Sequence, residues 1–120
     1  MQREEMEARL VSFSQRVIRL YKAISGTPPG EHIAMQLTRA ATSVGANYAE
    51  AIRSRSGAEF LSKIQISLAE ASESHHWLRV IEGSEFVAAG RLTDLIDEAS
   101  QIVAILQSTV DTYRKNHKKK

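Results

Sequence analysis

The amino-acid sequence predicts an all-α protein, an antiparallel up-down-up-down four-helix bundle. Apolar residues recur at steps of three and four along four long segments, which is the spacing of one helix face. No segment alternates apolar and polar residues with the period of two that a half-buried strand would show. The segments are joined by short connections, so neighbouring helices are expected to run antiparallel. A chain of 120 residues with 42% hydrophobic residues is typical of one globular domain.

The first helix is expected over residues 3–24 and the second over residues 31–53. Between them, Ser25-Gly26-Thr27-Pro28-Pro29-Gly30 is predicted to stop the first helix, because two prolines and two glycines leave little helical backbone. The expected core residues of the first helix are Met6, Leu10, Phe13, Val17, Leu20 or Tyr21, and Ile24.

The second helix carries a stripe of small residues, Ala41, Gly45 and Ala49, beside its apolar face. A glycine inside a helix costs about 1 kcal/mol relative to alanine. Close packing against a neighbouring backbone is the plain compensation, so we expect this helix to lie unusually near another. Its expected core residues are Leu37, Ala41, Val44, Tyr48 and Ile52.

The third helix is expected over residues 57–82 and the fourth over residues 91–115. Ser56-Gly57-Ala58-Glu59 has the form of a capping box, which places a helix start directly after a tight corner. The expected core of the third helix is Phe60 or Leu61, Ile64, Leu68, Ala71, His75 and Leu78. The expected core of the fourth is Leu92, Leu95, Ala99, Ile102, Leu106, Val110 and Tyr113.

Charge divides the chain into an acidic body and a basic end. Five of the 16 lysines and arginines lie in residues 114–120, so residues 1–113 carry a net charge of −3. We therefore predict a bundle domain over residues 1–116 and a basic disordered tail over residues 117–120. The chain has no cysteine, which excludes disulfides and thiolate chemistry. No signal peptide and no apolar run long enough for a bilayer is visible, so the expectation is a cytoplasmic protein without a membrane partner.

Residues 36–51 read Q-L-x-R-A-A-x-S-V-x-x-N-x-A-E-A, and residues 68–78 read L-x-E-A-x-E-x-x-x-W-L. With Arg53, Ser56, Glu59-Phe60-Leu61 and Lys63, this pattern resembles a bacterial four-helix-bundle family encoded within intervening sequences of 23S ribosomal RNA genes. The accessory proteins of diversity-generating retroelements are similar to it. The resemblance implies a bundle that assembles into a ring, with five subunits as the leading expectation, and for which binding of RNA or other nucleic acid has been proposed.

The polar residues of the resemblance have two interpretations. They form either a structural polar network that fixes helix register or subunit contacts, or a site for a ligand or partner. The network is favoured because these residues alternate with small packing residues, and Arg53 is the natural partner for a carboxylate of the third helix. The predicted network comprises Asn47, Glu50, Arg53, Glu70 and Glu73.

The sequence argues against an enzyme. A di-iron bundle needs two Glu-x-x-His pairs and two further glutamates, whereas Glu73 and His76 form a single such pair. Glycine loops with phosphate-cradling spacing and nucleophile elbows are absent. We therefore predict no catalytic residue, no metal and no cofactor.

Two functions remain, and the first is binding of RNA or DNA by basic patches on the oligomer. The expected contacts are Arg16, Arg19, Lys22, Arg53, Arg55, Lys118, Lys119 and Lys120. The alternative is a protein-binding scaffold without nucleic-acid activity. Apolar faces wider than one core seam favour a homo-oligomer, with interface residues Ile66, Trp77 and Val103.

Overall fold

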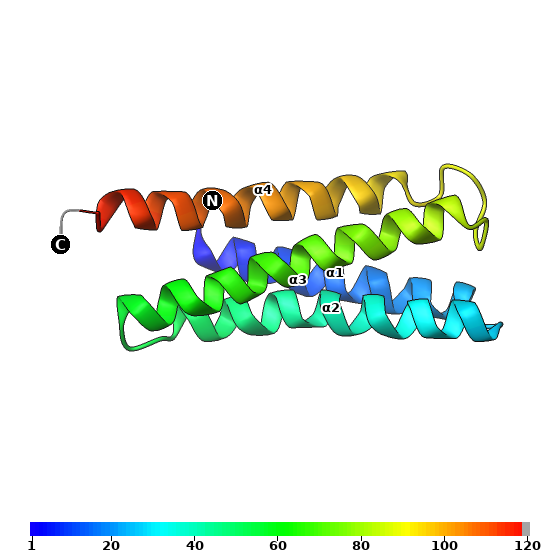
Figure 1. The fold of residues 1–120 in the computed structure, drawn as a ribbon, viewed down its shortest axis with the longest axis horizontal. Helices are drawn as coiled ribbons and strands as arrows, with labels where there is room; N and C mark the ends of the chain where they lie inside the picture. The colour runs from blue at the N-terminus through cyan, green and yellow to red at the C-terminus, as the bar shows by residue number, and fades with distance from the viewer. Residues whose placement is uncertain (119–120) are drawn as a thin grey trace.

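The computed structural model describes residues 1–118 and consists of four helices, with no strand in that range. They are α1 (Arg3–Ile24), α2 (Pro28–Ile52), α3 (Gly57–Gly83) and α4 (Thr93–Asn116). Successive helices run in opposite directions along a rod of 51 × 22 × 21 Å (Figure 1). The all-α four-helix fold predicted from the sequence is confirmed. Lys119 and Lys120 of the predicted tail lie outside the described residues, and the division at residue 116 stays a prediction.

The second helix begins at Pro28, three residues before the predicted start. The first amides of a helix have no partner within it, so a proline in the first turn loses no hydrogen bond. Thr27 caps this end, because its hydroxyl accepts a bond from the Gly30 amide at 3.2 Å. Gly30 is packed against the end of α1, where a Cβ would lie 1.9 Å from the Ile24 carbonyl oxygen. The two prolines therefore have two roles: they form the first turn of α2, and they separate it from α1.

The corner between α2 and α3 is as tight as the capping pattern predicts. The second helix ends at Ile52, and α3 starts at Gly57 after the N-cap residue Ser56. The Ser56 hydroxyl accepts a hydrogen bond from the Glu59 amide at 3.1 Å. This bond caps the first turn of α3 only four residues after α2 ends.

The core residues expected on α1 and α4 are confirmed, apart from Tyr21 and Tyr113, which are half-buried. The small stripe of α2 lets α1 come close, since a Cβ at Gly45 would lie 3.4 Å from the Leu10 Cβ. The Ser14 hydroxyl of α1 also donates to the Ala41 carbonyl of α2 at 3.3 Å. The close approach predicted for α2 is thus made with α1 along this stripe.

The core seam of α3 differs from the expectation. Leu68 and His75 are half-buried, whereas Ser67 and Ser74 are fully buried. The Ser67 hydroxyl donates to the Val44 carbonyl of α2 at 2.8 Å, and Ser74 donates to its own helix at 2.8 Å. A small side chain with a satisfied hydroxyl can therefore sit where α2 and α3 pack together. The buried residues of α3 are Ile64, Ser67, Ala71, Ser74, Leu78 and Ile81.

The seam between α1 and α4 is the most open in the bundle. Helix α3 packs along both α2 and α4, while α1 packs along α2 and makes few close backbone approaches to α4. Arg9 spans this seam, donating to both carboxylate oxygens of Glu98 at 2.7 Å and to the Gln101 side chain at 2.8 Å. The seam is hollowed on either side of this bridge.

Candidate nucleic-acid interface

A basic hollow lies at the end of the α1–α4 seam next to the α3–α4 connection. Its volume is about 380 Å³. Three arginines line it, Arg16 and Arg19 from α1 and Arg91 from the connection, together with Asp94 in the first turn of α4. The remaining lining residues are the buried leucines Leu20, Leu92 and Leu95. The charged lining residues thus sum to +2 over an apolar floor.

Four basic side chains outside the hollow, Arg9, Arg39, Arg53 and Lys63, are neutralised by ion pairs. Arg39 of α2 binds Glu70 at 3.2 Å and also binds Glu73, both on α3. Lys63 of α3 reaches Glu50 at 2.7 Å. Arg9 is held by Glu98 as described above. None of the five ion pairs found within residues 1–118 includes an arginine of the basic hollow.

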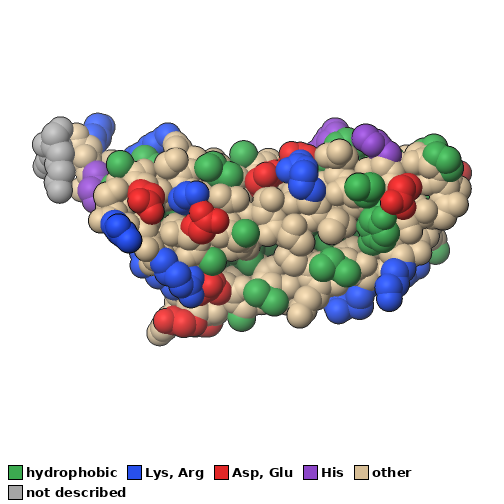
Figure 2. Space-filling model, turned by 90° about the horizontal axis from the view of Figure 1, so that it is seen from below, with side chains coloured by type: hydrophobic (Ala, Val, Ile, Leu, Met, Phe, Trp, Pro, Cys, Tyr) green, Lys and Arg blue, Asp and Glu red, His purple; other side chains and the backbone are tan. Residues whose placement is uncertain are grey.

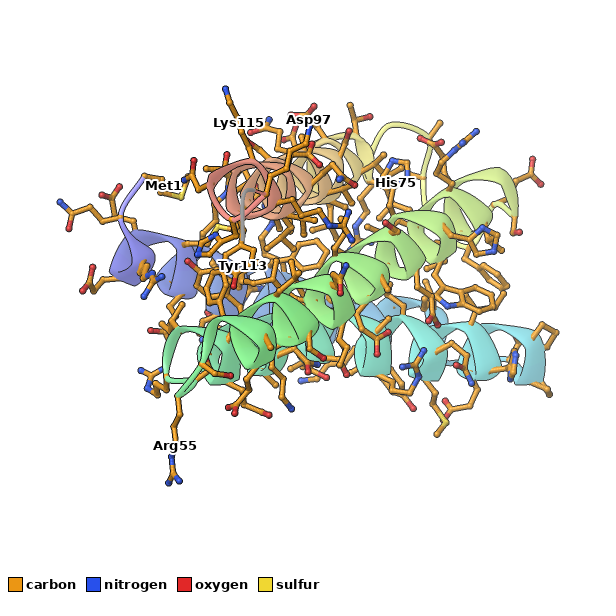
Figure 3. The ribbon with its side chains drawn as sticks, turned by 60° about the vertical axis from the view of Figure 1, so that its left-hand side comes forward. Met1, Arg55, His75, Asp97, Tyr113 and Lys115 are labelled. Carbon is orange, nitrogen blue, oxygen red and sulfur yellow. The ribbon has the colours of Figure 1, made fainter. Side chains whose placement is uncertain are left out.

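The structure brings only part of the predicted nucleic-acid surface together. Arg16 and Arg19 share the basic hollow, whereas Lys22 is exposed and does not line it. Arg53 and Arg55 lie at the α2–α3 corner, where Arg55 points away from the bundle (Figure 3). On the face seen in Figure 2, lysines and arginines gather toward the two ends of the rod. The predicted contacts therefore fall into two separate groups.

The other predicted nucleic-acid contacts are Arg53 and the lysines of the tail. Arg53 pairs with Glu7 of α1 at 3.2 Å, and not with a carboxylate of α3 as the sequence suggested. The reason is its position as the C-cap residue of α2, beside the beginning of α1. Lys118 is exposed, and Lys119 and Lys120 lie outside the described residues.

The five residues of the predicted polar network do not form one connected hydrogen-bonded group. Asn47 donates to the Ser43 carbonyl of its own helix at 2.9 Å, and Glu50 is bound by Lys63. Glu70 and Glu73 share Arg39. All are half-buried or exposed, because the small residues of α2 and the serines of α3 fill the interface itself. Within this chain Glu50, Glu70 and Glu73 therefore form ion pairs across the rim of the α2–α3 contact, whereas Asn47 and Arg53 do not.

Trp77 is anchored in this rim. Its indole Nε1 donates to the Glu73 carboxylate at 2.9 Å, and the rings of His32 and His76 meet it edge-on at 6.4 and 5.1 Å. The bond from Trp77, followed by that from Arg39, lowers the pKa of Glu73 below its ordinary value. Among residues 1–118 no group of three His, Asp or Glu side chains is placed to hold a metal ion.

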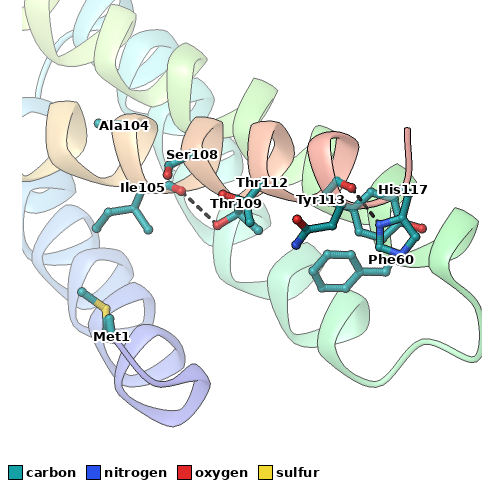
Figure 4. Close-up of a pocket in the computed structure, with 10 residues that line it drawn as sticks. Met1, Phe60, Ala104, Ile105, Ser108, Thr109, Thr112, Tyr113 and His117 are labelled. Carbon is teal, nitrogen blue, oxygen red and sulfur yellow. Dashed lines mark hydrogen bonds between the residues drawn. The ribbon is translucent and has the colours of Figure 1, made fainter. Parts of the chain in front are cut away.

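An apolar groove of about 640 Å³ lies at the opposite end of the α1–α4 seam. Met1 and Ile105 lie on its two sides, and Phe60 and Tyr113 close its end (Figure 4). The Tyr113 hydroxyl sits against Gly57, where a Cβ would lie 2.1 Å from it. No lysine, arginine or carboxylate lines this groove, and its polar lining consists of Ser108, Thr109, Thr112, Tyr113, Asn116 and His117.

The arrangement of helices and motifs agrees with the comparisons to known proteins. A sequence model of the family described as 23S rRNA-intervening sequence protein matches residues 6–108. The chain belongs to this family. A crystal structure of a protein of unknown function from the S23 ribosomal protein family of Bacteroides thetaiotaomicron is similar, with a TM-score of 0.84 and 27% sequence identity. The similarity covers 92% of this chain and 99% of that one. No curated protein matches the chain.

The family match identifies the fold and the relatives, but neither description names a catalytic activity. Among the described residues of this 23S rRNA-intervening sequence protein, no helix is long and apolar enough to cross a bilayer. Function therefore has to be argued from the surface of the bundle.

The predicted oligomer interface is only partly exposed in this 23S rRNA-intervening sequence protein. Ile66 is 42% exposed, whereas Trp77 and Val103 pack against the core. The largest exposed apolar side chains of the helices are instead Met35 at 56%, Val11 at 55% and Ile18 at 47%. These lie on α1 and α2, so the chain presents more than one uncovered apolar face.

Arg91 is the residue that sequence reasoning missed. It lies more than 70 positions from Arg16 and Arg19, and the sequence predicts it as the first residue of the fourth helix, which begins two residues later at Thr93. Only the antiparallel return of α4 along α1 brings the three guanidinium groups to one hollow. A helix-pairing argument that set the beginning of α4 beside the second half of α1 could have found it.

Proposed function

We propose that this 23S rRNA-intervening sequence protein is a non-catalytic, oligomeric bundle that binds RNA or other nucleic acid through the basic groups at its ends, assisted by its tail. The observation that carries the proposal is the distribution of ion pairs. They neutralise Arg9, Arg39, Arg53 and Lys63. They leave the arginines of the basic hollow outside every pair found within residues 1–118, together with other basic side chains such as Arg55, Arg114 and Lys115. The family's description, which refers to 23S rRNA, makes RNA the first probe.

The charge of the body shapes the expected mode of binding. Because residues 1–113 carry a net charge of −3, attraction must come from local groups and the tail, not from the overall charge. Contacts to phosphates release counterions and carry no sequence information. The sequence contains no base-reading motif, so we expect binding that is strongly salt-dependent and nearly indifferent to sequence.

The test is a titration of labelled single-stranded RNA and DNA by fluorescence anisotropy at several salt concentrations. For the full chain, log K should fall linearly with log salt. Replacing Lys118, Lys119 and Lys120 with serine keeps the length and should reduce the slope by up to about 2, at roughly 0.7 per phosphate contact on a single strand. Adding Arg16→Gln and Arg19→Gln should remove most of the remaining affinity, with the melting temperature as the control for folding.

A protein-binding scaffold is the competing outcome, favoured by the exposed Ile66 on α3. It predicts a flat titration with both nucleic acids even at low salt. It also predicts a protein partner that is lost in Ile66→Lys. Flat titrations would therefore remove nucleic-acid binding from the proposal and leave the scaffold.

A further inference from the structure

We propose that the basic hollow between α1 and the beginning of α4 is a phosphate-binding site, in which Arg91 completes a three-arginine clamp with Arg16 and Arg19. The inference rests on the proposed function and assigns its main anion contact to one place. The ligand class is a phosphate group, carried either by a nucleic-acid backbone or by a free phosphate or pyrophosphate.

The residue types suit this ligand. Guanidinium groups present rigid forks of donors that match phosphate oxygens, and they stay charged at all working pH values. The floor of the hollow is formed by leucines that are at most 7% exposed, so the charges face an apolar wall as well as solvent. A low-dielectric wall strengthens an ion contact relative to one surrounded by water.

The open seam gives the arginines room to converge. Here α1 and α4 do not fill the space between them, and Arg16, Arg19 and Arg91 enter from two separate segments. The neighbouring carboxylate Glu98 is hydrogen-bonded by Arg9, and Arg16 acts on it through charge alone, without a hydrogen bond or an ion pair. Asp94, in the first turn of α4, is the one carboxylate in the lining, so the three arginines keep a net charge of +2 there.

The beginning of α4 offers a further set of donors. Its N-cap residue is Leu92, which has no side-chain acceptor and makes no capping bond. The Thr93 amide already donates to the Gly90 carbonyl at 3.3 Å, so the next two amides, those of Asp94 and Leu95, are the ones for which a phosphate oxygen is a suitable acceptor. The arginines and these amides would thus act on the same anion. Arg91 belongs to the site because it directly precedes the N-cap residue of α4.

The experiment compares Arg91→Gln with Arg79→Gln in the full chain. Arg79 is an exposed arginine of α3 that lines a different hollow, so its removal changes the net charge equally. One readout is the affinity for a labelled 12-nucleotide RNA across a salt series. The other is a titration with inorganic pyrophosphate, followed by the NMR shifts of the Asp94 and Leu95 amides and the arginine side chains.

We expect Arg91→Gln to weaken RNA binding by about three- to ten-fold and to reduce the salt slope by about 0.7, while Arg79→Gln leaves both nearly unchanged. Arg19→Gln should reproduce the effect of Arg91→Gln from the other side of the hollow. Pyrophosphate should shift the Asp94 and Leu95 amides in Arg79→Gln but not in Arg91→Gln.

The outcomes separate the site from the function. If RNA binds and both hollow variants behave like Arg79→Gln, the clamp is wrong and nucleic-acid binding stands on other groups. If RNA and DNA do not bind but pyrophosphate binds in the hollow and is lost in Arg91→Gln, the proposed function is wrong and the site serves a free phosphate. If neither RNA nor pyrophosphate responds to Arg91→Gln, the inference is overturned.

Discussion

At Gly45 the backbone of α2 comes within ordinary contact distance of α1, because a Cβ there would lie 3.4 Å from the Leu10 Cβ and 3.9 Å from its carbonyl carbon. This distance leaves room for one methyl group and for nothing larger. The packing role of the small stripe on α2 could be predicted from the sequence, since a glycine inside a helix is destabilising unless close packing compensates for it. The sequence could not predict which helix packs on this stripe, because the apolar faces of several helices are compatible with it.

Two substitutions at Gly45 test the close approach. Gly45→Ala should stabilise the protein by about 0.5–1 kcal/mol, because alanine is the better helix former and its methyl fits. Gly45→Leu should destabilise it by about 1–3 kcal/mol through overpacking against Leu10. Urea unfolding at one protein concentration measures both. If the leucine variant were the more stable of the two, this face of α2 would be uncovered.

The Glu73–Trp77 bond makes a prediction about pH. Trp77 is the only tryptophan, so its fluorescence reports this site alone. The pKa of Glu73 lies below the ordinary 4.5, chiefly because the indole and then Arg39 stabilise the carboxylate. The stabilisation is therefore complete above the ordinary pKa and is lost as the pH falls through the lower folded value.

An acid titration of the emission of Trp77 should show a step with a midpoint below pH 4.5. Glu73→Gln should abolish the step, because the amide oxygen still accepts the indole bond but no longer titrates near this pH. Glu82→Gln, on the exposed side of the same helix, is the matched control and should leave the step in place. If the step that Glu73→Gln removes had its midpoint above pH 4.5, the assigned contacts would be contradicted; a step that persists in Glu73→Gln belongs to another group beside the indole, such as His32 or His76.

At the scale of the helices, hydrophobic spacing predicted α1 and α4 well and α3 less well. The seam of α1 is made of large apolar residues at regular steps, so periodicity alone identifies it. In α3, Ser67 and Ser74 are fully buried with their hydroxyls hydrogen-bonded, Ser67 to the Val44 carbonyl of α2 and Ser74 to its own helix. A hydropathy pattern ranks serine as polar and so shifts the predicted seam toward Leu68 and His75, which are half-buried in the structure.

The Arg9–Glu98 bridge is predicted to be the main polar link between α1 and α4. Arg9 holds both carboxylate oxygens, and the two side chains are only 23% and 17% exposed. A double-mutant cycle with Arg9→Gln and Glu98→Gln should give a coupling energy above about 1 kcal/mol. The same cycle on Arg39 and Glu70, where the arginine is 48% exposed, should give about 0.2–1 kcal/mol. The reverse order would mean that the open seam is held by other contacts.

For the whole molecule, the sequence was enough to predict the family fold and two of the three arginines of the candidate site. Arg16 and Arg19 could be paired from helical spacing, since they are three residues apart. The third arginine, Arg91, reaches the hollow only because α4 runs back along α1 and because the seam between these two helices stays open there. Both are properties of the assembled bundle, and no local pattern in the sequence encodes them.

The assembly of several chains is the last prediction. Val11 and Ile18 lie seven residues apart on one face of α1 and are about half exposed, and Met35 and Ile66 add apolar surface on α2 and α3. Faces of this kind on different helices suit a heterologous contact, which closes into a ring when the rotation between subunits allows it. Sedimentation equilibrium at micromolar concentration should therefore give a multiple of 13.4 kDa, with five copies as the leading expectation.

Three variants locate the contact. Val11→Lys with Ile18→Lys should lower the mass if α1 is covered in the assembly, and Ile66→Lys should do so if α3 is covered, as the sequence suggested. Gln15→Lys, at an exposed polar position of α1, is the control and should leave the mass unchanged. Each lysine is added at an already exposed position, so folding should survive and a fall in mass would report the lost interface. A wild-type chain that sediments as a monomer at this concentration would remove the ring, and each basic hollow would then have to bind its phosphate alone.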